Sequence, residues 1–451
     1  MLRPSLLALV LLLVGCERPF IEPEAPTLEI LEPTDLGTVR VDPELQLAFR
    51  ASSFRNVSRV EVNGVKATYL RDEDVYLDTL QLRVGLNTIL VDAFDTEGTV
   101  GTDTLYAVHL PYGFANVGVQ LPEPLGGHTA TLLQDGNLLF TGGAPRLDGI
   151  AKTSISLLDL HPDLQRLVIV ESSAGLLSQR VGHTASLLPD GRVLILGGSR
   201  RALPTSSEDF VTTVEIYDPA SSTCSEVPLV DINGAPATPI QRTEHTTALL
   251  TNEDGEVFVY LYGGLVPRFD GNGVVPSSFM RTLRFDLDDN QLVALGPPER
   301  FLFTALSGHT QTPLADVDAD GFGSYLVAGD AASSDPDLRA PFTFSFTPSF
   351  VDAQNVGSLT QPRTDHAAAP LGELVLVTGG RMLESETSVT RSTEVFASSP
   401  AAFFDFPERL LPNLARSSHT ATNLGRDRIL LVGGFSASGE ALDRIELFLP
   451  R

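Results

Sequence analysis

Alternate aspartates form the first group of side chains in this chain that could bind a ligand. The run ADVDADGFGSYLVAGD, at 315–330, places three carboxylates two residues apart just before a glycine. Alternate carboxylates on a tight loop converge on one hard cation, and the glycine permits the turn. The pattern predicts a structural Ca²⁺ site, with a solvated acidic hairpin as the alternative. The candidate ligands are Asp316, Asp318, Asp320, the carbonyl of Phe322 and Ser324.

Histidines recur at a regular interval, which raises a second possible chemistry. Six of the eight lie 53 to 64 residues apart in equivalent settings. A repeat of this period is typical of propeller blades, which would place the histidines far apart around a ring. We therefore expect them to make the same local hydrogen bonds in every blade rather than to share a metal. They are His128, His183, His245, His309, His366 and His419.

The segment around each histidine predicts the strands of one repeat. In RVGHTASLLPDGRVLILGGS, at 180–199, one strand leads through the hairpin signal Asp190-Gly191 to a continuous apolar strand, which we expect to be buried on both faces. A Gly-Gly pair follows, where backbone passes too closely for a side chain. The run TVEIYD predicts a third strand and SEVPLV a looser fourth. Four of the histidines also have an arginine three residues before them: Arg180, Arg242, Arg363 and Arg416.

This unit resembles the kelch repeat in its bacterial form, R-x-x-H-T-A … D-G-R-V-L-x-x-G-G … E-x-Y-D-P. The resemblance covers residues 111–451 and implies a six-bladed, all-β kelch-type propeller. The tryptophan that kelch units usually carry after their tyrosine is replaced here by Cys224. We interpret this cysteine as a packing residue and not as a reactive thiol. The last repeat lacks a fourth strand, and we expect residues 114–121 to supply it and close the ring.

Kelch propellers include enzymes, and the resemblance implies two kinds of site. The copper oxidases related to galactose oxidase use Tyr and His ligands and a Cys crosslinked to a Tyr. Cys224 is the one thiol of the mature chain that such a crosslink could use, and no Tyr-rich run accompanies it. A carbohydrate-active enzyme with its site at the channel mouth is the other possibility.

The first residues predict a bacterial lipoprotein. Arg3 precedes an apolar run that is too short to span a bilayer but has the length of a signal-peptide core. The run ends in LVGC, which resembles a lipobox, so residues 1–16 are expected to be a signal peptide and Cys16 the lipidated N-terminus. Residues 17–26 are expected to form an extended tether. Because Glu17 and not Asp follows the cysteine, we expect an outer-membrane lipoprotein of the cell envelope.

Residues 27–110 predict a small β domain ahead of the repeats. Several short runs alternate apolar and polar residues, and Asn63-Gly64 is a strong hairpin signal. Runs such as VEVNGV resemble bacterial Ig-like modules, which implies a small Ig-like β-sandwich. We interpret it as a stalk, with ligand adhesion as the alternative.

Charge excludes some partners, and the repeats suggest others. The formal net charge of −26 repels nucleic acid phosphates and anionic lipid headgroups. We therefore predict a non-enzymatic scaffold that is membrane-bound through its lipid alone and binds an envelope protein or a glycan. Its candidate contact loops are 199–210, 265–280 and 330–341. The alternative is a carbohydrate-active or oxidoreductase-type kelch enzyme, and a convergent acid–base pair with shifted pKa values at the channel mouth would favour it.

Overall fold

A computed structural model describes most of the chain, and its elements are almost all β-strands. The described residues are 24–160, 167–268, 273–295, 300–329, 342–347, 350–356, 358–382 and 388–450. The signal peptide with Cys16, most of the tether and the loop 330–341 lie outside them. Short 3₁₀ turns occur at η1 (Ser207–Asp209) and η3 (Glu408–Leu410). Within the described ranges no helix has the length and apolar character needed to cross a bilayer.

The chain divides into two compact units. The first holds the residues up to Thr34 with Glu44–Leu80 and Thr88–Leu105, and the second holds Asp35–Pro43, Gln81–Asn87 and Tyr106–Arg451. In the described ranges both units are all-β. The domain boundaries expected from the sequence and the Ig-like assignment of the first domain stay predictions.

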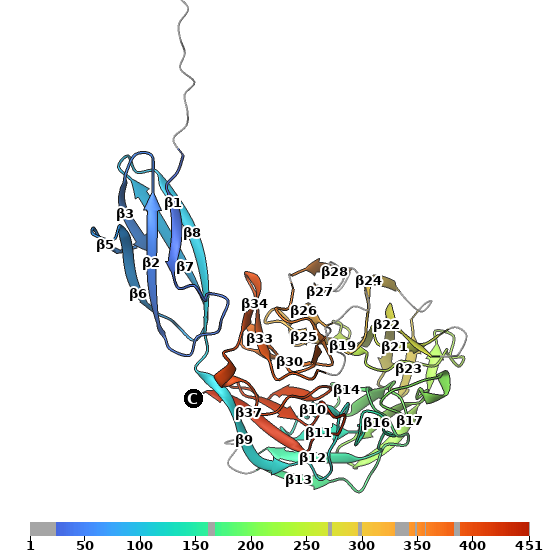
Figure 1. Cartoon of the computed structure of the whole chain (residues 1–451). Helices are drawn as coiled ribbons and strands as arrows, with labels where there is room; N and C mark the ends of the chain where they lie inside the picture. Colours follow the sequence, from blue (N-terminus) through green and yellow to red (C-terminus); the bar gives the residue numbers. More distant parts are fainter. Residues whose placement is uncertain are drawn as a thin grey trace, which may run out of the picture. The chain divides into compact units, whose positions relative to one another are not determined.

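Two four-stranded sheets form the N-terminal β domain (Figure 1). Asn63 and Gly64 take φ of 49° and 78° in the hairpin between β3 and β4, the left-handed backbone that this turn requires. Leu47, Phe49 and Val91 lie in the domain's buried interior. The first sheet contains β1 (Thr27–Glu32), β2 (Glu44–Ser52), β6 (Val75–Gln81) and β5 (Thr68–Leu70), and the second contains β4 (Val65–Lys66), β3 (Val57–Val62), β7 (Gly85–Asp95) and β8 (Val100–His109).

The repeats form a succession of sheets in the second unit (Figure 1). Their strands are, in sheet order, β10 (Thr129–Leu132), β11 (Leu138–Thr141), β12 (Ile155–Leu160) and β13 (Leu167–Glu171); β14 (Thr184–Leu187), β15 (Val193–Leu196), β16 (Val214–Asp218) and β17 (Thr223–Val227); β19 (Thr246–Thr251), β20 (Val257–Tyr262), β22 (Val274–Asp286) and β23 (Gln291–Ala294), with β18 (Leu229–Asp231), β21 (Leu265–Pro267) and β24 (Arg300–Leu306) added; β25 (Thr310–Pro313), β26 (Gly323–Ala328), β27 (Phe342–Thr347) and β28 (Phe350–Asn355); β30 (Ala367–Leu371), β31 (Leu374–Thr378), β33 (Thr393–Ser398) and β34 (Ala401–Asp405), beside the small pair β29 (Arg363–Thr364) and β32 (Arg381–Met382); and β35 (Thr420–Asn423), β36 (Ile429–Val432), β37 (Arg444–Pro450) and β9 (Tyr112–Gln120).

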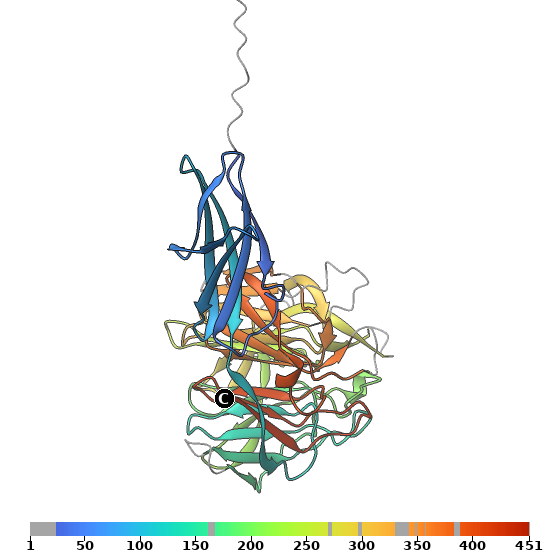
Figure 2. The same cartoon turned by 60° about the vertical axis from the view of Figure 1, so that its left-hand side comes forward.

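The first strands of these sheets line the inside of a closed ring. β10 contacts β14, and the contacts continue through β19, β25, β30 and β35 back to β10. Figure 1 shows the sheets arranged around these strands, and Figure 2 shows the same molecule turned by 60°. The second strands behave as predicted: all four residues of β15 and of β36 are buried. The continuous apolar pattern of these strands follows from burial on both faces.

The ring closes by pairing the two ends of the repeat region. β9 runs antiparallel to β37, with Phe114 opposite Phe448 and Ala115 opposite Leu447. The prediction that residues 114–121 supply the missing strand of the last repeat is confirmed. Because this strand comes from before the first histidine, it ties the start of the repeat region to its end.

The fourth strand expected from SEVPLV is divided between two sheets. β17 ends at Val227, and β18 pairs in parallel with β23 of the next sheet. Pro228 separates them, because it has no N–H to continue the ladder. Its carbonyl instead accepts a hydrogen bond of 2.8 Å from the N–H of Leu292.

Candidate functional site

Five of the six repeated histidines link their sheet to the sheet before it. Nε2 of His245 lies 3.2 Å from the hydroxyl of Thr184, and Nε2 of His366 lies 2.8 Å from that of Thr310. The same bond joins His128, His183 and His309 to the threonine that follows the preceding histidine in the ring. Burial lowers the pKa of His245 and His366 to about 3, so these rings are neutral.

One of these bonds is missing. The residue that follows His366 is Ala367, so the sheet before His419 offers no hydroxyl at this place. Within the described residues, Nε2 of His419 has no hydrogen-bond partner although it is buried. The His–Thr pairing thus accounts for the threonine that follows the other five histidines.

The Gly-Gly pairs lie against these histidines. A Cβ on Gly197 would come within 2.6 Å of Cε1 of His245 and 2.5 Å of the carbonyl oxygen of Arg242. A Cβ on Gly142 would meet His183 and Arg180 in the same way. Side chains are excluded here because the next sheet packs directly on the backbone.

Buried ion pairs between an arginine and a glutamate recur in several repeats. The sequence singled out the arginines of these pairs but not the glutamates. Arg180 and Glu215 pair with both side chains fully buried, and Arg180 also donates to the carbonyl of Gly197 at 2.8 Å. Glu215 accepts hydrogen bonds from the N–H groups of Leu177 and Ser178 at 2.8 and 3.0 Å. The glutamate of the TVEIYD strand was the available signal. The corresponding pairs are Arg363–Glu394 and Arg416–Glu446.

A belt of backbone hydrogen bonds surrounds the centre of the ring. It consists of the residue immediately before each repeated histidine, and each N–H in it donates to the carbonyl of the belt residue before it, at 2.7 to 3.3 Å. Every belt residue has a left-handed φ between 49° and 65°. We call these residues the channel belt: Gly127, Gly182, Glu244, Gly308, Asp365 and Ser418.

Glycine is the expected residue in the channel belt. A Cβ on Gly182 would lie 2.4 Å from the hydroxyl of Thr243, and a left-handed φ costs other residues roughly 1–2 kcal/mol. Glu244, Asp365 and Ser418 carry this backbone geometry without the freedom of glycine. Strained positions that persist in a fold are concentrated at functional sites.

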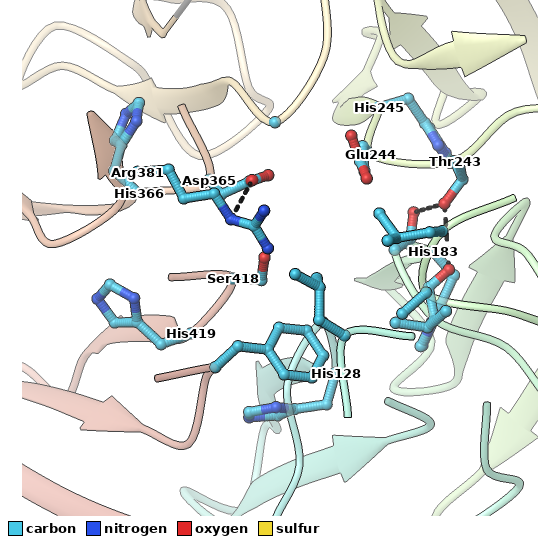
Figure 3. Close-up of a pocket in the computed structure, with 18 of the residues that line it drawn as sticks. His128, His183, Thr243, Glu244, His245, Asp365, His366, Arg381, Ser418 and His419 are labelled. Carbon is cyan, nitrogen blue, oxygen red and sulfur yellow. Dashed lines mark hydrogen bonds and ion pairs between the residues drawn. The ribbon is translucent and has the colours of Figure 1, made fainter. Parts of the chain in front are cut away.

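The two acidic members of the belt converge on one cavity. It is lined by belt residues and histidines of every repeat, with Leu147, Val181, Ala202, Leu203 and Phe435 forming an apolar wall. Figure 3 shows the carboxylates of Glu244 and Asp365 facing the middle of this channel cavity, with the guanidinium of Arg381 beside Asp365. Arg381 Nε lies 3.4 Å from Asp365 Oδ2.

Enclosure gives this pair unusual acidities. Burial, reinforced by the charge of Asp365, raises the pKa of Glu244 to about 8. Burial also raises the pKa of Asp365, and Arg381 opposes that rise. The Asp365 side chain keeps 17% of its surface exposed, so it can be reached from the cavity. The arrangement can hold a proton on Glu244 at neutral pH, and the guanidinium of Arg381 favours the charged form of the neighbouring Asp365 carboxyl group.

Sequence reasoning missed this pair because 121 positions separate its members, 244 and 365. A signal was nevertheless present. In an alignment of the six repeats, the position before the histidine holds glycine three times, and the exceptions are Glu244, Asp365 and Ser418. The histidines themselves drew attention because they are the same in every repeat.

The aspartate loop is placed as an exposed hairpin before β26. Asp318 Oδ1 accepts the N–H groups of Asp320 and Phe322 at 3.0 and 2.9 Å, and Asp316 Oδ2 accepts that of Ser324 at 3.1 Å. The carbonyl of Phe322 accepts the N–H of Asp318. These bonds explain the spacing of the aspartates as turn-forming residues. Ca²⁺ binding at this loop stays a prediction.

Two of the candidate contact loops have described residues. The loop 199–210 contributes Ala202 and Leu203 to the channel cavity. Within 265–280, residues 269–272 lie outside the description, and the flanking residues pair as β21 and β22. This second loop does not line the channel cavity in the part of the chain that is described.

A copper centre of the galactose-oxidase type does not fit these residues. Cys224 lies opposite Tyr217 on the outer strands of its sheet, and burial raises the pKa of its thiol to about 11. Neither residue lines the channel cavity. Across the described ranges, no three His, Cys, Asp or Glu side chains are grouped so that they could hold a metal ion.

Comparison with known proteins places the fold. No family model matches the chain. Two curated proteins from Gibberella zeae, both named galactose oxidase, are 37% identical over 89 residues, which is 20% of this chain and 13% of theirs. A solved structure titled "Structure of YjhT" matches 73% of this chain and 96% of its own, with a TM-score of 0.53 and 15% identity. The YjhT likeness shows the fold alone, and together these likenesses support a kelch-type β-propeller.

The comparison also corrects the prediction that the protein is not an enzyme. The curated relatives bear the name of an oxidase, which contradicts a purely non-enzymatic interpretation. A site whose residues belong to different repeats does not form a motif that is recognisable along the sequence. In the folded ring, residues of different repeats meet at the centre.

Proposed function

We propose that this protein is a carbohydrate-active enzyme that carries out general acid–base chemistry in the channel of a six-bladed kelch-type propeller. The observation that carries the proposal is the convergence of Glu244 and Asp365 at belt positions where glycine is the expected residue. The name of the curated relatives supports a sugar as the substrate. The channel site corresponds to the enzyme alternative derived from the sequence.

The charges of the site suggest a role for each residue. Glu244, with its raised pKa, is the proton donor to a sugar oxygen. Asp365, beside Arg381, is the base that accepts a proton from a hydroxyl group or from carbon. Pairs whose environments separate their pKa values are the usual basis of acid–base assignment. The apolar wall of the cavity offers a surface for the C–H face of a sugar ring.

The test is an NMR assay of substrate turnover in D₂O with monosaccharides, uronic acids and simple glycosides. We expect cleavage, anomeric exchange or hydrogen–deuterium exchange at carbon with the wild-type protein. Glu244→Gln and Asp365→Asn are each expected to lower the rate by about 10²-fold or more, the usual contribution of a positioned acid or base. Asp254→Asn, in an exposed hairpin, is the matched control.

The pH dependence gives a second readout. Activity should fall as pH rises through about 8, because Glu244 then loses the proton that it must donate. The Glu244→Gln variant should lose this alkaline limb together with its activity. Wild-type activity in both carboxylate variants, or an unchanged pH profile in Glu244→Gln, would contradict the proposal.

The remaining sequence-based predictions are retained as part of the proposed biology. We place the enzyme in the cell envelope as an outer-membrane lipoprotein anchored at Cys16 and held away from the membrane by an Ig-like stalk. A glycan of the envelope is then the natural substrate, and binding to an envelope protein through the loops remains a proposal. Calorimetry with millimolar Ca²⁺ on the wild type and on Asp318→Ala tests the aspartate loop.

A further inference from the structure

A second cavity adjoins the channel cavity and shares three lining residues with it. We call it the rim cavity, and Leu147, Leu203 and Arg381 belong to both. Arg381 therefore both pairs with Asp365 and lines the rim cavity. The complete lining of the rim cavity is Arg146, Leu147, Asp148, Leu203, Arg381, Val389 and Ser436–Gly439.

Hydrogen bonds between loops hold the rim cavity in shape. The N–H of Leu147 donates to the carbonyl of Gly439 at 2.8 Å, and that of Ala202 donates to Gly149 at 3.2 Å. The side chain of Arg146 pairs with Asp148 at 3.1 Å and also with Glu440. Loops of three different repeats are thus joined before any ligand arrives, which lowers the entropy cost of binding.

The chemistry of the rim cavity suits a polyhydroxylated ring. Ser436 and Ser438 present hydroxyl groups 2.9 Å apart, and Arg146 and Asp148 add a donor and an acceptor. The aliphatic side chains of Leu203 and Val389 add apolar surface to the same lining. A few polar groups set in an apolar wall fix the orientation of a bound ligand.

We propose that the rim cavity binds a second sugar unit, so that the substrate is an oligosaccharide or a glycoside whose reacting unit lies in the channel cavity. This inference rests on the proposed function. It places the bond between the two units near Arg381, the charged residue among the three that line both cavities, and thus beside Asp365 and Glu244. The variable loops after the Gly-Gly pairs then select the second unit, as loops on a rigid scaffold do.

The experiment compares saccharides of different length on the full chain. Ligand-observed NMR titrations would use galactose against lactose and melibiose, and glucose against cellobiose. We expect the preferred disaccharide to bind about tenfold tighter than its monosaccharide. Arg146→Gln should remove most of this difference and leave monosaccharide binding unchanged. Arg50→Gln, which breaks a similarly exposed ion pair in the first unit, is the control.

The outcomes separate this inference from the proposed function. Equal affinity for monosaccharide and disaccharide, or equal weakening of both by Arg146→Gln, overturns the two-unit site and leaves the acid–base proposal intact. If none of these saccharides binds the wild type, both proposals fail. Melting temperatures of the variants show whether the fold is preserved, and loss of an exposed ion pair should change them little.

Discussion

Two neighbouring positions of the repeat can be compared around the whole ring: the histidine and the residue just before it. The histidine is the same in all six repeats, is buried, and in five of them bonds to a threonine of the adjacent sheet. The residue before it faces the channel cavity and changes from glycine to Glu244, Asp365 or Ser418. A residue that is the same in every repeat therefore packs one sheet on the next. A residue that differs between repeats presents a side chain that a ligand in the channel can reach.

The largest change in stability should come from breaking one of the buried Arg–Glu pairs that recur between repeats. Glu215→Gln leaves Arg180 as a fully buried guanidinium without its carboxylate, and we expect a loss of about 3–5 kcal/mol in the free energy of unfolding. Chemical denaturation measures this loss, with the exposed Glu226→Gln on β17 as the control. An effect below about 1 kcal/mol would show that the buried pair is not a structural element of the blade.

The opposite result is expected for the channel belt. Glu244→Gly removes a partly buried carboxylate and a left-handed non-glycine residue, and should raise the free energy of unfolding by about 1 kcal/mol at pH 8 while abolishing activity. The stability gain is reduced by the greater entropy of glycine in the unfolded chain.

The reverse change in the same belt is the control for that prediction. Gly182→Ala should destabilise the protein, because its Cβ would lie 2.4 Å from the hydroxyl of Thr243 in a left-handed backbone. If Glu244→Gly is as destabilising as Gly182→Ala, then Glu244 is a structural residue and the contrast between the two positions is lost.

An effect of similar size is expected in the repeat where the histidine lacks its threonine. Ala367→Thr supplies a hydroxyl toward Nε2 of His419, and we expect a gain of about 0.5–1.5 kcal/mol, the net value of a typical hydrogen bond. Ala367→Val, which has nearly the same shape without the hydroxyl, is the control. An equal result for both variants would mean that side-chain volume, and not the hydrogen bond, decides stability at this position.

Much of the fold could be predicted because its causes are local or periodic. The apolar run of β15 and the Asp190-Gly191 turn each express a constraint within one repeat, whereas the Gly-Gly pair expresses the packing of the next sheet, which recurs at every repeat. The closing strand β9 could be expected because the last repeat lacked a partner for β37. The division of SEVPLV at Pro228 was missed, because which sheet a short strand joins depends on the position of its neighbours.

The sequence by itself determined the all-β repeat, the residues that pack one sheet on the next and the strand that closes the ring, since each follows from spacing and side-chain type. Only the tertiary structure decided where the chemistry lies. The aspartates of 316–320, close together in sequence, form the turn of an exposed hairpin, whereas Glu244 and Asp365, from distant repeats, line the same channel cavity. The physical reason is that ring closure brings equivalent positions of distant repeats together. Burial there raises the pKa of two carboxyl groups that the sequence shows only as isolated acids.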